Sequence, residues 1–134
     1  LYDAHMHLLP YGVTMRQLDI RPAAAPTLDR LLGLVRERAA RAGPGAWIQG
    51  RGYDQFALDV GRHPHRDELD AVAPDNPVVL TRACGHIAIA NSMALRLAGI
   101  DEGSVPPQGG AIEQRDGRLT GLLAENARDP LKAV

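Results

Sequence analysis

The clearest periodic pattern in the chain predicts a helix over residues 28–42. Its apolar side chains recur every three or four positions, the spacing that gathers them on one face of a helix: Leu28, Leu31, Leu32, Val35, Ala39 and Ala42. Thr27 precedes this run as a side-chain N-cap, and Gly43 and Pro44 end it. The arginine-rich opposite side is expected to face solvent.

Alternating or continuous apolar runs predict strands in five other places. These are residues 1–9, 18–20, 46–50, 77–82 and 86–90, and Asp116-Gly117 is expected to turn a hairpin between 111–114 and 118–121. Shorter helices are predicted over 67–72, over 92–98 with Asn91 as N-cap and Gly99 after the end, and over 122–127. The motif RGYD at 51–54 is interpreted as a tight turn.

The alternation of strands and helices predicts one domain over residues 1–134. Its expected class is α/β or α+β, with a mixed β-sheet and flanking helices. A length of 134 residues is that of a single domain.

Charge and composition then limit the possible partners. Lys plus Arg number 15 and Asp plus Glu 16, so the net charge of -1 gives no excess for binding nucleic acid or an anionic membrane. We find no apolar run of the roughly 18 residues that a membrane span needs and no export signal. Cys84 is the single cysteine, which is compatible with a cytoplasmic protein.

His5 and His7 are the sharpest candidate for chemistry. Residues two apart on a strand point the same way, so two imidazoles can reach one divalent metal. As a bare pattern, His-x-His also suits a pair of ordinary polar side chains.

Four segments in order resemble a known family. They are DAHMHL at 3–8, GRGYD at 50–54, RDELDAVAPDNPVVLTRACGHIAIANSMALRLAGI at 66–100 and GGAIEQRDGRLTGLLAENA at 109–127. DAHMHL alone would also suit other metallohydrolases, including phosphoesterases. Together the four resemble the amidohydrolase superfamily, in the branch of N-substituted formamide deformylase-like metal-dependent hydrolases.

The resemblance implies the fold and the extent of a longer enzyme. The family's catalytic domain is a (β/α)₈ barrel, which needs roughly 200 to 250 residues. We therefore expect this chain to be an N-terminal portion, with residues 1–12 as the end of the first barrel strand and 13–134 as an inserted α+β segment. A truncated barrel strand leaves an unpaired edge, which predicts a homo-oligomer.

The resemblance also implies hydrolysis of C–N bonds in small amide-type substrates by metal-activated water. His5 and His7 match the family's first two metal ligands, and the cofactor is expected to be a divalent metal, with zinc preferred. The other ligands and the mechanistic aspartate come from later strands, and Lys132 lacks the context of the family's lysine ligand. Without them the isolated segment is expected to be inactive. The alternative is a non-catalytic α+β lid or assembly domain.

Two further residues match family positions near the substrate pocket, His86 and Glu125. His86 is interpreted either as a substrate contact or as a structural histidine, and Glu125 either as a site residue or as a solvated carboxylate. Asn91 is interpreted as the helix cap rather than a substrate contact.

The remaining histidines and the cysteine have simpler interpretations. His63 and His65 form a second His-x-His pair, but Pro64 between them indicates an exposed loop rather than a metal site. Cys84 is interpreted as a small buried apolar residue rather than a nucleophile.

Overall fold

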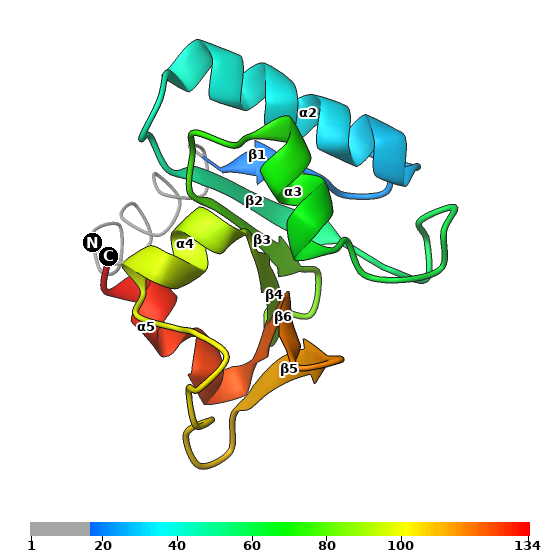
Figure 1. Ribbon diagram of the computed structural model, residues 1–134. Coiled ribbons are helices and arrows are strands. Elements are labelled where there is room, and N and C mark those ends of the chain that lie inside the picture. The colour runs from blue at the N-terminus through cyan, green and yellow to red at the C-terminus, as the bar shows by residue number, and fades with distance from the viewer. Residues whose placement is uncertain (1–16) are drawn as a thin grey trace, which may run out of the picture.

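The computed structural model describes residues 17–134, which form one six-stranded mixed sheet in the order β1-β2-β3-β4-β6-β5 (Figure 1). The strands β1 (Leu18–Asp19), β2 (Ile48–Tyr53) and β3 (Val78–Arg82) are parallel. The antiparallel strands are β4 (Ile87–Ala90), β5 (Ala111–Arg115) and β6 (Arg118–Ala124). The mixed sheet predicted from the sequence is confirmed. The strand predicted over 1–9, and with it the segment 1–12, lies outside the described residues.

The helices flank this sheet as the sequence predicts. The longest is α2 (Leu28–Ala42), and the Thr27 hydroxyl accepts the Arg30 backbone N–H at 3.1 Å as the expected cap. The others are α3 (Arg66–Val72), α4 (Ser92–Leu97), a 3-10 turn (Glu125–Arg128) and α5 (Asp129–Lys132). No helix in residues 17–134 is both long and apolar enough to cross a membrane.

Two apolar clusters cover opposite faces of the sheet. Strand β3 sends Val78 and Leu80 into the first cluster, where α2 and α3 pack, and Val79 toward the second. Strand β6 divides in the same way, with Leu122 against the first cluster and Leu123 within the second. This alternation follows from the two-residue period of a strand. Helices α2 and α3 lie over one side of the sheet (Figure 1), and the first cluster fills the space between them and the strands.

The predicted turn at RGYD is wrong, because β2 continues through Tyr53. The strand accommodates Gly52 as an irregularity of its pairing with β3 between Arg51 and Tyr53. Gly52 has φ +106°, and a Cβ there would lie 2.4 Å from the Cγ atom of Arg21. Glycine is therefore used here for a strand bulge and a close approach rather than for a turn.

The predicted helix over 122–127 is also wrong at its start. Residues 122–124 extend β6, because Leu122 pairs with Ile89 and Leu123 pairs with Ala88. Helical geometry begins only at Glu125. The apolar pair Leu122 and Leu123 fits either element locally, and the antiparallel neighbour decides for the strand.

Side-chain caps fix where helices α3 and α4 begin. Helix α3 begins one residue earlier than predicted, and His65 caps it: its Nδ1 accepts from Asp67 N, and Glu68 accepts from the backbone N–H of His65. Asn91 caps α4 as predicted, and Gly99 follows with φ +71°.

Candidate functional site

Polar side chains gather at one edge of the sheet, where several strands end. Strands β2 and β3 end together there, since Tyr53 pairs with Arg82. The start of β4 and the end of β6 meet at the same edge, since Ile87 pairs with Ala124. In sheets of this kind ligands bind outside the carboxyl ends of the parallel strands. We call this group of strand ends, where His86, Glu125 and Arg82 lie, the strand-edge site; it is the candidate functional site.

His86 and Glu125 form the central contact of this site. The Nδ1 atom of His86 lies 3.1 Å from a carboxylate oxygen of Glu125, and the backbone N–H of Glu125 donates to the carbonyl of His86 at 2.8 Å. Both side chains are open to solvent, 65% and 53% exposed. The structure thus brings together the two residues that the sequence marked as substrate contacts, although 39 positions separate them.

The backbone of Glu125 is held in an unusual conformation. Its φ is +52°, in the left-handed region that residues with a Cβ rarely adopt. The strain falls at the residue whose main chain and side chain both bond to His86. Strain at a position with two tertiary bonds is typical of functional sites.

The hydrogen bond defines what the imidazole of His86 can do. When the ring is neutral, a carboxylate at Nδ1 can only accept, so Nδ1 carries the proton and Nε2 has a free lone pair. The ring is therefore held by one nitrogen and presents the other as an acceptor. That is the arrangement of a histidine that binds a donor or moves a proton.

Arg82 organises the neighbouring polar groups, and sequence reasoning missed it. Its guanidinium donates to the amide oxygen of Gln55, lies 3.4 Å from a carboxylate oxygen of Asp54, and stacks over the Phe56 ring at 5.9 Å. The signal in the sequence was a charged residue closing the β-branched run 77–82.

Cys84 is exposed, which corrects its interpretation as a buried apolar residue. It sits in the β3–β4 turn, where apolar packing has no role. Burial would raise the pKa of its thiol, but the N–H of His86, a hydrogen bond from Arg82 and the N–H of Ile87 lower it below the usual value.

Asn91 has no part in this site. Its side chain is completely buried and accepts from Val78 N and Ala94 N while donating to Asn76 O. With both ends of its amide engaged inside the protein, it can make no contact with a substrate.

The described part of the chain contains no complete set of metal ligands. Within 17–134 we find no group of three His, Cys, Asp or Glu side chains close enough to bind one ion. His63 and His65 diverge, since His63 bonds the Tyr53 hydroxyl and His65 caps α3. His5 and His7 lie outside the described residues.

Removing the Glu125 carboxylate is expected to release the imidazole of His86. At about pH 8.5, well above the usual histidine pKa, ¹⁵N spectra should show His86 with its proton on Nδ1. Glu125→Ala should move the proton population toward Nε2, whereas Glu125→Gln keeps an acceptor and should preserve Nδ1–H. Glu37→Ala, an exposed carboxylate on α2, is the control. An unchanged spectrum in Glu125→Ala would contradict the hydrogen bond.

Comparisons with known proteins agree with this fold. The N-substituted formamide deformylase of Arthrobacter pascens is 37% identical over 133 residues, covering 98% of this chain and 24% of that protein. Amidohydrolase YtcJ of Bacillus subtilis is 36% identical, covering 98% of this chain and 25% of the relative. A metal-dependent hydrolase from Pyrococcus horikoshii superposes with a TM-score of 0.71 at 29% identity, over 96% of this chain and 22% of that one. The chain thus spans about a quarter of the length of these relatives.

The family assignment rests on the whole of the sequence. A model of the amidohydrolase family matches residues 1–134, which include both the strand-edge site and the histidine pair near the start. The chain belongs to the amidohydrolase family.

Proposed function

We propose that this chain contributes to a metal-dependent enzyme that hydrolyses the C–N bond of small amide-type substrates. Membership of the amidohydrolase family is the observation that carries the proposal. A relative named for deformylation of N-substituted formamides, and a structural neighbour described as metal-dependent, support it. In the reaction, water adds its oxygen to the carbonyl carbon, the C–N bond breaks, and the nitrogen leaves as an amine with a proton from water.

His5 and His7 are the proposed ligands of a divalent metal, with zinc as the preferred ion. Two imidazoles suit zinc, but a catalytic zinc site takes three protein ligands, and residues 17–134 hold no complete set. The remaining ligands are assigned to the part of the relatives' length that this chain does not span. When bound, the metal would polarise a carbonyl and lower the pKa of its water toward roughly 7.

His86 and Glu125 are the proposed substrate-facing residues. Since Glu125 holds Nδ1, the Nε2 atom of His86 is free to accept the N–H of an amide. Glu125 acts by orienting this ring, and its own carboxylate is exposed beside it. The pair thus recognises the donor side of the amide group.

Replacing both metal ligands is expected to abolish metal binding and amide hydrolysis. His5→Ala with His7→Ala removes both imidazoles, and elemental analysis together with turnover of an N-substituted formamide measures the loss. The matched control is the other His-x-His pair, as His63→Gln with His65→Asn, because asparagine preserves the cap of α3. This control should retain its metal content. Full metal content and activity in the His5, His7 variant would refute the ligand roles.

The second candidate is a non-catalytic α+β lid or assembly domain. The absence of a three-ligand group in 17–134 favours it for the described part of the chain. Calorimetric titration with zinc should then show weak binding or none. Stoichiometric binding with a sub-micromolar Kd would contradict this candidate, since it requires more than two imidazoles.

Association of copies and a cytoplasmic location stay predictions. The sheet's outer strands within the described residues are β1 and β5, and each has one unpaired side there. Light scattering is expected to give a mass above that of one chain, and a monomer at high concentration would argue against association.

A further inference from the structure

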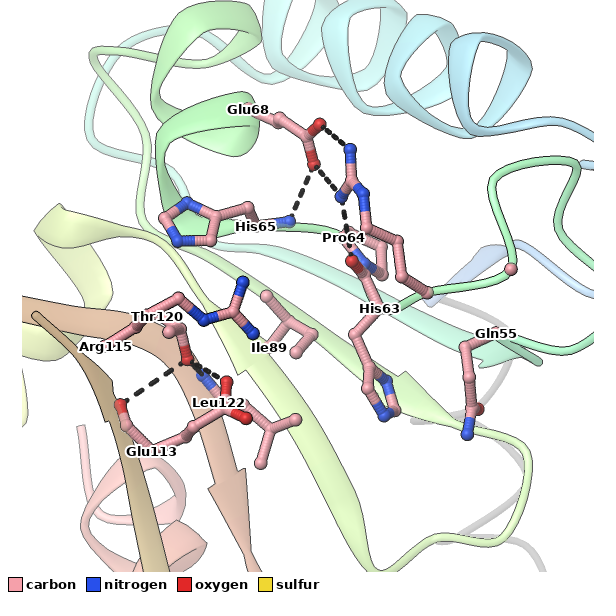
Figure 2. A pocket seen from close by; sticks show the side chains of 12 residues that line it. Gln55, His63, Pro64, His65, Glu68, Ile89, Glu113, Arg115, Thr120 and Leu122 are labelled. Carbon is pink, nitrogen blue, oxygen red and sulfur yellow. Dashed lines mark hydrogen bonds and ion pairs between the residues drawn. The ribbon is translucent and has the colours of Figure 1, made fainter.

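A pocket lies away from the His86 and Glu125 pair, between the segment 61–65, helix α3 and the β5–β6 hairpin (Figure 2). Its volume is about 570 Å³, within the range of small-molecule sites. Ile89 and Leu122 give it apolar lining, and its polar lining includes two histidines. In Figure 2, Arg115 and Thr120 of the hairpin face the histidine side across the pocket.

His63 is fixed in one tautomer. Its Nδ1 lies 2.9 Å from the hydroxyl of Tyr53, a residue with no exposed surface. Burial keeps the phenol protonated by raising the pKa of Tyr53, and a buried O–H needs an acceptor. The hydroxyl therefore donates to Nδ1, and the proton of the neutral ring sits on Nε2. Burial, with the charge of Arg82, lowers the pKa of His63 and favours that neutral ring.

His65 is fixed in the same way by a different partner. Its Nδ1 accepts the backbone N–H of Asp67 at 3.2 Å in the cap of α3. The neutral ring must then carry its proton on Nε2. Both histidines of this pocket thus present N–H donors.

The other polar groups that line the pocket and lack a hydrogen-bond partner in the described part of the chain are also mainly donors. Arg115 forms no ion pair with any carboxylate in residues 17–134, and the oxygen of Gln55 is taken by Arg82, which leaves its NH₂ free. The two acids of the lining are partly engaged: Glu68 by Arg62 and His65 N, and Glu113 by the Thr120 hydroxyl. The surplus of donors calls for a ligand rich in acceptors.

We propose that this pocket binds a small carboxylate with an apolar body, its carboxyl group held by Arg115 with one histidine N–H donor and its body against Leu122. A guanidinium with a free face is the side chain best matched to a carboxylate. The proposal is independent of the metal and of amide hydrolysis, because it uses neither the pair His86 and Glu125 nor the proposed ligands His5 and His7.

Benzoate and benzamide are the probes, since they have the same shape and differ in charge. Titration into the ¹⁵N-labelled protein should give saturable shifts at His63, His65 and Arg115 with benzoate, with a Kd on the order of 1 mM. Benzamide should bind at least about tenfold more weakly, because it lacks the charge that pairs with Arg115. Equal binding of the two probes, or benzoate shifts confined to other residues, would overturn the proposal.

Arg115→Gln is expected to weaken benzoate binding about tenfold, and Arg115→Lys to restore part of it. Arg115 is exposed on an outer strand, so these variants should fold. Arg41→Gln makes the same charge change at the exposed end of α2 and should bind as the unaltered protein does. Equal losses in Arg41→Gln and Arg115→Gln would indicate a general charge effect and overturn the site.

Discussion

Replacing Asn91 with alanine is expected to lower the free energy of unfolding by about 4 kcal/mol. The side chain is completely buried, and its oxygen accepts from Val78 N at 2.9 Å and from Ala94 N at 3.0 Å. Its NH₂ donates to Asn76 O at 2.8 Å. Alanine would remove the cap of α4 and leave three backbone groups without partners in a place that water cannot reach. Urea unfolding followed by circular dichroism measures the change.

Two further variants separate the cap from the rest of this network. Asn91→Ser keeps a side-chain cap but is too short for all the other bonds, so a loss of about 2 kcal/mol is expected. Asn126→Ala removes an exposed amide that donates to Gln108 O at 3.1 Å, and should change stability by less than about 0.5 kcal/mol. A loss below about 1 kcal/mol in Asn91→Ala would show that water replaces the missing bonds.

Gly121→Ala is expected to cost more than about 3 kcal/mol. A Cβ at this position would lie 2.5 Å from the carbonyl oxygen of Ala90 and 3.0 Å from the Cβ of Arg66. Gly121 also has φ +96°, which an alanine adopts only with strain. The carbonyl belongs to the neighbouring strand β4, so relief requires the two strands to separate. Thermal and urea unfolding would measure the loss.

Gly117→Ala is the matched control for the close approach. Gly117 has φ +74° in the hairpin turn, but a Cβ there meets nothing within 4 Å. It should therefore show only the conformational cost of about 1 kcal/mol. If Gly121→Ala costs no more than Gly117→Ala, the contact between β4 and β6 is looser than the structure shows.

Local patterns were sufficient for the elements whose signals lie within a few residues. Helix α2 begins after Thr27 and ends before Gly43 as predicted, because the cap, the apolar spacing and the glycine all act over one or two turns. The Asn91 cap was predicted for the same reason. The local pattern could not predict that Asn91 also hydrogen-bonds β3 and the segment 73–76, because those partners are distant in sequence.

The two errors in secondary structure arose where a neighbouring strand decides. Leu122 and Leu123 suit a helix or a strand, and only pairing with β4 selects the strand. The glycine of RGYD suits a turn, and only the parallel ladder with β3 makes it a bulge. Local propensity is weak when a tertiary partner supplies several backbone hydrogen bonds.

The sequence by itself determined the family resemblance, the mixed α/β class and the main helix. It also identified His86 and Glu125 as candidate site residues. Each of these depends on motifs or on spacing along the chain. Only the tertiary structure decided that these two side chains meet, that Asn91 is completely buried, and that Nδ1 of His63 and of His65 each has a hydrogen-bond partner. The physical reason is that hydrogen-bond partners and burial are fixed by packing between strands that lie far apart in the sequence, and no local pattern encodes those distances.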